Sequence, residues 1–242
     1  MQGEHRDPRG AFQPRKPCMP RKPTSSTVTK VRNARGKGRP SVGGAVGRQK
    51  LIDCTRELLR TIPPARLTSN DIARAVGGDR ALVRYYFGTM ANLLSEVASQ
   101  LSAGLVTSLS DASKVGGSAT GRLRSRIQQF VRYELENPAL HPLYTEQLLS
   151  DQSAPTRKIV RRIASEGHIS FMAIIEEGRR SGEFRKDFDI RLLDIAIVGL
   201  CEFIVVGQPI LEAWLSPGER VSDLLTHYAD FVADLVVNGI SS

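Results

Sequence analysis

The sequence predicts an all-α protein with three parts: a basic arm, a small helix-turn-helix head and a larger helical bundle. The chain has 242 residues, of which 40% are hydrophobic and only 6% aromatic. That length allows a substantial core, and the scarcity of aromatic residues argues against a β-sandwich or barrel. From residue 48 onward, apolar residues recur at spacings of three and four, and glycines, prolines and capping residues interrupt the pattern. Such spacing is typical of amphipathic helices.

The first part, residues 1–46, is predicted to be a disordered basic arm. It is rich in Pro, Gly and Ser, and the first 50 residues hold 13 Lys and Arg but only two acidic residues, Glu4 and Asp7. Such a segment cannot bury enough apolar surface to offset the entropy of its chain. The first 50 residues therefore carry a net charge of +11, whereas the whole chain carries +9, so the excess positive charge lies in this segment. A polyanion, either nucleic acid or an anionic membrane surface, is the partner that this charge predicts.

One motif within the arm suggests a more specific role. Residues 35–40 read Arg-Gly-Lys-Gly-Arg-Pro, which resembles an AT-hook, a turn that places an arginine in a narrow A·T-rich minor groove. Arg39 is therefore a candidate DNA contact. A charge run that only raises nonspecific affinity is the simpler alternative, and it stays open.

Residues 67–94 pack two very short helices and the start of a third into one glycine-punctuated unit. Thr68 and Asp71 have the spacing of a capping box at the start of the first helix. Gly77 and Gly78 end that helix, and Asp79 is a suitable N-cap for a second helix over 80–86. Thr89 starts the third. This arrangement is typical of a DNA-binding helix-turn-helix.

The second short helix carries two arginines and two tyrosines on barely two turns. So few residues cannot bury that many polar groups, so Arg80, Arg84, Tyr85 and Tyr86 are expected to face a partner rather than a core. DNA is the natural partner for such a surface.

The segment from Arg48 to Leu94 resembles the TetR-type bacterial transcriptional regulators, in register and without a gap. The residues that carry the resemblance are Leu51, Ile52, Thr55, Leu58, Leu59, Thr68, Asp71, Ile72, Ala73, Gly77, Tyr85, Tyr86, Phe87, Thr89, Leu93 and Leu94. The chain departs from the family pattern at Pro63, Pro64, Ser69, Gly78, Asp79, Arg84 and Met90. These departures leave the fold prediction intact but make the operator sequence harder to infer.

The resemblance implies that residues 47–93 form a helix-turn-helix domain that binds a double-stranded DNA operator. The resemblance also implies which residues contact the DNA. Base or backbone contacts are expected from the second short helix, and phosphate contacts from residues at helix N-termini. Together with Arg39, the candidate DNA-binding residues are Thr68, Asp79, Arg80, Arg84, Tyr85, Tyr86 and Thr89.

Residues 94–242 are predicted to form a helical effector-binding and dimerisation domain. The expected helices cover 89–114, 120–136, 139–150, 154–180, a segment beginning at Asp189, and a final one from 217. The last is assigned because Ser216 and Glu219 have capping-box spacing and Pro217 would occupy the first helical position. The resemblance implies a homodimer through the helices within 189–210 and 217–238. A purely intramolecular core is the alternative for these apolar helices.

The resemblance also implies a pocket for a small organic effector within this domain. Six aromatic or histidine residues on its helices are the candidate lining: Phe130, Tyr133, Tyr144, His168, Phe171 and Phe203. Effector binding is expected to release the protein from a palindromic operator, which makes a repressor the expected function. Nothing in the sequence identifies the effector.

Other function classes find little support in the sequence. The four histidines are scattered, and no P-loop, nucleophile elbow or metal-ligand spacing stands out, so neither an enzyme, a metal site nor a cofactor is indicated. The cysteines lie far apart, and Cys201 reads as a buried hydrophobe rather than a redox sensor. Without a signal peptide or an apolar run long enough to span a bilayer, a cytoplasmic, nucleoid-associated protein is expected. A sequence-nonspecific nucleic-acid or chromosome-architecture protein is the alternative function.

Overall fold

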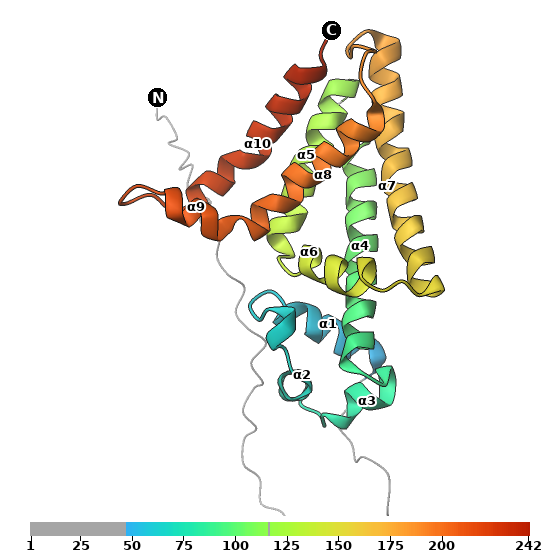
Figure 1. Cartoon of the computed structure of the whole chain (residues 1–242), viewed down its shortest axis with the longest axis vertical. Helices are drawn as coiled ribbons and strands as arrows, with labels where there is room; N and C mark the ends of the chain where they lie inside the picture. Colours follow the sequence, from blue (N-terminus) through green and yellow to red (C-terminus); the bar gives the residue numbers. More distant parts are fainter. Residues whose placement is uncertain (1–46, 116) are drawn as a thin grey trace, which may run out of the picture. The chain divides into compact units, whose positions relative to one another are not determined.

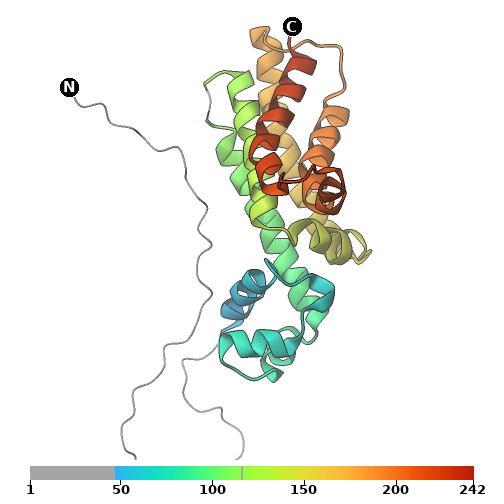
Figure 2. The same cartoon turned by 90° about the vertical axis from the view of Figure 1, so that its left-hand side faces the viewer.

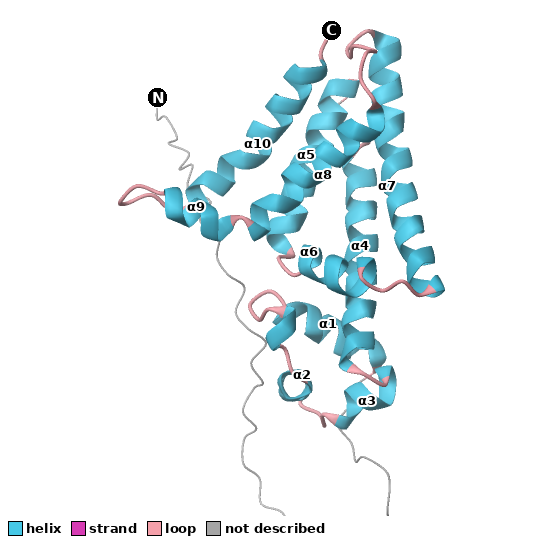
Figure 3. Ribbon diagram, in the orientation of Figure 1, coloured by secondary structure: helices cyan, strands magenta, loops and turns pink. Residues whose placement is uncertain are grey.

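A computed structural model describes residues 47–115 and 117–242, and all regular secondary structure in this part is helical (Figures 1 and 3). The all-α prediction is confirmed. The arm, with Arg39 and the AT-hook-like motif, lies outside the described residues. The boundary at residue 93 stays a prediction, since one long helix, α4 (Met90–Ala112), runs across it without interruption.

The head consists of three α-helices and a short 3-10 turn. They are α1 (Arg48–Leu58), η1 (Pro64–Arg66), α2 (Ser69–Val76) and α3 (Ala81–Phe87). The capping box at the start of α2 forms as predicted: the Thr68 amide donates to Asp71 Oδ2 at 3.0 Å, and the Asp71 amide donates to Thr68 Oγ1 at 3.3 Å. Gly77 ends α2 in the left-handed region with φ +66°, a conformation that other residues adopt at a cost.

Helix α3 begins at Ala81, one residue later than predicted. Asp79 still caps it, because its Oδ1 accepts the Ala81 amide at 2.7 Å. Val83 and Phe87 are buried against the head core. The guanidinium of Arg48 lies over the Phe87 ring at 4.8 Å and donates to Glu96 of α4 at 3.1 Å, so α1, α3 and α4 are tied together at one corner.

Seven further helical elements follow α4. They are α5 (Ala119–Glu136), α6 (Leu140–Leu143), the π-helix η2 (Tyr144–Leu149), α7 (Ala154–Ser181), α8 (Ile190–Val206), α9 (Gln208–Trp214) and α10 (Val221–Ile240). One end of α4 packs on α1 and α3, and the rest packs on α5, α6, η2 and α7. Figures 1 and 2 show α4 passing from the head into the bundle.

The buried side chains form two hydrophobic clusters. The first joins the head to the N-terminal half of α4 and to α6 and η2, through residues such as Leu101, Leu140 and Leu148. The second lies among α5, α7, α8 and α10. Leu105 of α4 packs against both clusters, so the core of the head is continuous with part of the bundle.

Two helix predictions for the bundle are wrong in detail. The final helix begins at Val221 rather than 217, because Gly218 has φ +95° and Ser216 and Glu219 instead close a separate turn, in which the Ser216 amide donates to Glu219 Oε2 at 2.8 Å. The segment 139–150 is not one α-helix but α6 followed by the π-helix η2. The separate helix α9 was not predicted.

A close approach fixes the end of α7 against the loop that follows it. Gly178 lies against the ring of Phe184, which is fully buried, and its carbonyl accepts the Glu183 and Phe184 amides at 2.9 and 3.0 Å. A Cβ on residue 178 would overlap the Phe184 ring. Glycine is therefore needed here for space.

Gly178→Ala should reduce the free energy of unfolding by about 1 to 3 kcal/mol, because a methyl group would have to displace a well-packed aromatic ring. Thermal and denaturant unfolding followed by circular dichroism measure this. The double variant Gly178→Ala/Phe184→Leu is the control: the smaller side chain should make its loss less than the sum of the single losses. Strict additivity would contradict the packing argument.

Candidate DNA-binding surface and effector cavity

The outer face of α3 exposes the residues that the sequence assigned to DNA. Arg80, Arg84 and Tyr85 are exposed, Tyr85 to 81%, while Tyr86 is half-buried and stacks edge-on against Tyr85 with ring centroids 4.8 Å apart. Neither Arg80 nor Arg84 forms an ion pair with an acidic side chain of the described residues. Both guanidinium groups are thus available to an anionic partner.

Three of the other candidates occupy helix starts. Thr68 and Thr89 are the N-caps of α2 and α4, and Thr89 Oγ1 accepts the Asn92 amide at 3.1 Å. Asp79 caps α3 through the amide of its first residue. All three are exposed. Helix N-termini favour anions, so Thr68 and Thr89 are well placed for phosphate contacts, whereas the Asp79 carboxylate would repel a phosphate.

A cavity of about 650 Å³ lies in the bundle, lined by side chains from α4, α5, α6, η2, α7 and α8. Four of the six predicted ligand-binding residues line it: Phe130, Tyr144, His168 and Phe171. Tyr133 and Phe203 do not belong to the lining. The Tyr133 hydroxyl donates to the Leu101 carbonyl at 2.9 Å, and Phe203 is 59% exposed on the outside of α8.

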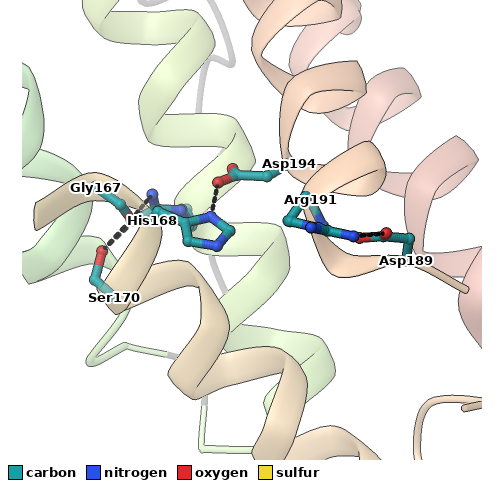
Figure 4. Close-up of polar contacts among 7 residues, drawn as sticks. Gly167, His168, Ser170, Asp189, Arg191 and Asp194 are labelled. Atoms are coloured by element: carbon teal, nitrogen blue, oxygen red, sulfur yellow. Dashed lines mark hydrogen bonds and ion pairs between the residues drawn. The ribbon is translucent and has the colours of Figure 1, made fainter. Parts of the chain in front are cut away.

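The cavity also holds ionisable side chains that sequence reasoning missed. His168 Nδ1 lies 2.6 Å from Asp194 Oδ2, linking α7 to α8, and Figure 4 shows this pair beside the Arg191–Asp189 ion pair. His141 Nδ1 lies 3.2 Å from Glu202 Oε2. Burial raises the pKa of Glu202, although the hydrogen bond from His141 opposes this shift.

Arg126 of α5 is buried but forms its hydrogen bonds with neutral groups. Its Nη1 donates to the hydroxyls of Ser170 and Ser113 at 3.0 and 3.3 Å, and its Nη2 donates to the Gly167 carbonyl at 2.9 Å. The guanidinium also lies 5.8 Å from the centroid of the Phe171 ring. Burial lowers the pKa of Arg126. The side chain holds α5 to α7.

Glu134, two turns further along α5, is the unusual residue of the cavity. It is fully buried, and neither of its carboxylate oxygens has a hydrogen-bond partner among the described residues. Burial, reinforced by the nearby charge of Glu202, raises the pKa of Glu134 to about 8. The signal in the sequence was the spacing: Glu134 and Arg126 fall on the same helical stripe as Leu123, Ile127 and Phe130.

Comparisons with known proteins identify this helical domain. The family model described as "Tetracyclin repressor-like, C-terminal domain" matches residues 120–236. Residues 120–236 are thus similar to the C-terminal domain of tetracycline-repressor-like proteins. The resemblance noted for residues 48–94 and the family match for the bundle therefore agree. Among curated proteins, none matches the chain.

Solved structures of TetR-type and related regulators share the fold. The ketosteroid transcriptional regulator KstR2 of Mycobacterium tuberculosis has a TM-score of 0.59 and 17% identity, and the match covers 81% of this chain and 95% of that one. FadR from Bacillus subtilis, solved in complex with stearoyl-CoA, has a TM-score of 0.60 and 18% identity, covering 80% and 100%. The TetR family regulator PfmR from Thermus thermophilus has a TM-score of 0.57 and 20% identity, covering 76% and 97%.

Two kinds of feature are absent from the described residues. No helix in residues 47–115 and 117–242 is long and apolar enough to cross a membrane. Within the same residues, no three His, Cys, Asp or Glu side chains come together in a group that could hold a metal ion.

The raised pKa of Glu134 predicts a pH dependence of stability. Its pKa rises from 4.5 to about 8 on folding, so between these values the folded chain holds a proton that the unfolded chain has released. Its contribution is therefore fully present below pH 4.5, falls as the pH rises to about 8, and is constant above that. Relative to Glu134→Gln, the wild type should lose about 1.4 kcal/mol per pH unit within this window.

Urea unfolding at pH 5, 6, 7, 8 and 9, at one protein concentration, measures this difference. Glu136→Gln is the matched control, because Glu136 lies on the same helix but is exposed, and its curve should run parallel to that of the wild type. A constant difference between wild type and Glu134→Gln over the same range would show that Glu134 does not titrate as described.

Proposed function

We propose that this chain is a homodimeric repressor that binds a palindromic DNA operator through α3 and is released when a small organic effector fills the bundle cavity. The observation that carries the proposal is that α4 belongs to both sites. Its first turns form the core of the head, and further along it Ser102, Leu105 and Val106 line the cavity.

On the DNA side, α3 is the recognition helix. Arg84 on α3 and Arg80 immediately before it have no acidic partner within the described part of the chain. A guanidinium can donate two parallel hydrogen bonds to a guanine edge in the major groove. Thr68 and Thr89 orient the head through phosphate contacts. Two such heads read two half-sites about 34 to 36 Å apart, which requires a dimer.

An exposed apolar surface on α8, α9 and α10 is the dimer interface in this proposal. Its members are Leu192, Ile195, Phe203, Val206, Ile210, Trp214, Leu224, Phe231 and Leu235, each at least 42% exposed. On α8 and on α10 the exposed residues follow the three-and-four spacing of one helical stripe, and the two helices pack against each other. Nine large apolar side chains exposed on neighbouring helices are typical of an interaction site.

In this proposal, operator binding and effector binding are coupled because the head and the cavity share packed side chains. Leu140 lines the cavity and also belongs to the cluster that forms the head core, while Leu105 touches both clusters. An effector that displaces α4 or α6 changes how the head is held, and hence the separation of the two heads. A protein of this fold, FadR from Bacillus subtilis, was solved with a bound small molecule, which supports an effector in this domain. By linkage, operator and effector weaken each other's binding by the same factor.

Arg84→Ala should weaken operator binding by about 1 to 3 kcal/mol, as expected for the loss of a bidentate base contact. Folding should be unaffected, since the side chain is exposed. Operator half-sites selected from random duplexes supply the DNA, and fluorescence anisotropy measures the affinity.

Arg66→Ala is the matched control, an exposed arginine of the same head that lies outside α3. It should bind like the wild type. An Arg84→Ala protein that keeps full operator affinity rules out the contact. If selection yields no preferred sequence and random DNA binds equally well, the alternative of a nonspecific nucleic-acid protein is favoured instead.

Phe231→Glu should convert the dimer to a monomer, because a carboxylate in an apolar interface lacks a partner and its desolvation is costly. Sedimentation velocity measures the mass, and affinity for a palindromic operator should fall more than affinity for a single half-site. Ile169→Glu is the control, since Ile169 is 66% exposed on α7, outside the proposed interface. A Phe231→Glu protein that remains dimeric would place the interface elsewhere.

A further inference from the structure

Three buried polar atoms lining the cavity have no hydrogen-bond partner in the described part of the chain. They are both carboxylate oxygens of Glu134 on α5 and the hydroxyl oxygen of Ser102 on α4. Both residues are almost fully buried, at 0% and 2% exposure. Buried polar groups without partners are rare in folded proteins and are costly, so their gathering in one cavity requires an explanation.

The other charged side chains of the cavity all have partners. Asp194 is bonded to His168, Glu202 to His141 and Arg191 to Asp189. The terminal nitrogens of Arg126 donate to two hydroxyls and a carbonyl. Glu134 is thus the one carboxylate or cationic side chain of this lining, within the described residues, that has no protein partner.

We propose that the effector is a primary amine with an apolar body, and that its ammonium group donates hydrogen bonds to Glu134 and Ser102. This inference rests on the proposed function for its effector role, but not for the binding itself. An ammonium group has three donors and no acceptor, which matches three oxygen atoms. Hydrogen bonds between ionised partners are also among the strongest in proteins.

The remainder of the cavity suits a hydrocarbon body. Phe130 lies one turn before Glu134 on the same face of α5, and Leu105, Ile127 and Ile163 add aliphatic surface. Arg126 and Glu134 are eight residues apart, about 12 Å along the helix axis, so the cationic and anionic ends of the cavity are separated by this apolar stretch. An anionic effector would have to compete with Ser113, Ser170 and Gly167 for the guanidinium of Arg126.

The protonation state of Glu134 should change when an amine binds. The raised pKa of Glu134 leaves its carboxyl mostly neutral at pH 7, so binding an ammonium ion there releases the carboxyl proton to the buffer. The titratable groups that line the cavity or lie beside Glu134 are Arg191, Asp194, Cys201 and Glu202 of α8, His141 of α6, Tyr144 of η2, His168 of α7, and Tyr133 and Arg126 of α5. Burial raises the pKa of Cys201, Tyr133 and Tyr144, which keeps these three neutral.

The test is isothermal titration calorimetry of the full chain at pH 8, without DNA, using n-octylamine, 1-octanol and octanoate as probes. These share one hydrocarbon chain, and the amine is protonated at this pH as a lysine side chain would be. Octylammonium should bind about 10- to 100-fold more tightly than either of the others, the range expected for charge-assisted hydrogen bonds.

Two variants locate the contact. Glu134→Gln should remove the preference for the amine over 1-octanol, and Glu136→Gln, on the exposed side of α5, should retain it. The affinity of the wild type for octylammonium should rise between pH 6 and 8, by up to about 10-fold per pH unit, and that of Glu134→Gln should not. Titrations in buffers of different ionisation enthalpy should show a proton released on binding.

Several results would overturn the proposal: equal affinity for the three probes, a preference for octanoate, no binding of octylammonium, or a preference that survives Glu134→Gln. A separate titration of the operator complex with octylamine then tests the effector role. If the amine binds through Glu134 but does not lower operator affinity, the ligand class stands and the proposed regulatory function fails.

Discussion

Helix α4 packs against two hydrophobic clusters at once, and the rest of the structure depends on this packing. Its first turns pack with α1 and α3, and Leu105 joins the head cluster to the bundle cluster. A packed interior resists continuous deformation, so a helix that two cores share cannot move in one without repacking the other. The head contributes only about half of the buried side chains in its own cluster, and nearly all the others come from α4, α6 and η2. The position of the DNA-facing surface and the shape of the cavity are consequently not independent.

Polar groups buried in the bundle show where packing alone does not explain the sequence. A helix needs only apolar residues to pack, and most inward positions of α5 are apolar. Arg126 and Glu134 are the exceptions, and they differ in kind. Both terminal nitrogens of Arg126 donate hydrogen bonds to groups of α7, whereas neither carboxylate oxygen of Glu134 has a partner among the described residues. A group that costs stability and binds no protein partner is typical of a functional site.

The sequence predicted those features that depend on neighbours in the chain. The capping box of Thr68 and Asp71 and the end of the helix at Gly77 depend on residues close together in the chain, and both formed as expected. The same reasoning failed at Ser216 and Glu219, because Gly218 adopts a positive φ that turns the chain away from a helix. The partners of Tyr133 and Glu134 could not be predicted, since one reaches Leu101 across the bundle and the other has none among the described residues. Such contacts depend on how distant helices pack, which local spacing does not encode.

Helix α8 has two faces with different tasks, and this bears on how an effector could reach the DNA. Its inner face presents Asp194, Ile197 and Glu202 to the cavity, while its outer face exposes Leu192, Phe203 and Val206. Ile195 lies between the two faces, since it is exposed and also lines the cavity. If the outer stripe is the dimer interface, as we propose, the cavity and the interface are separated by a single helix. A ligand that shifts α8 then changes the angle between protomers, and one that shifts α4 changes the angle of each head. Both displacements alter the distance between the recognition helices, so a small change at the cavity can abolish simultaneous binding to two half-sites.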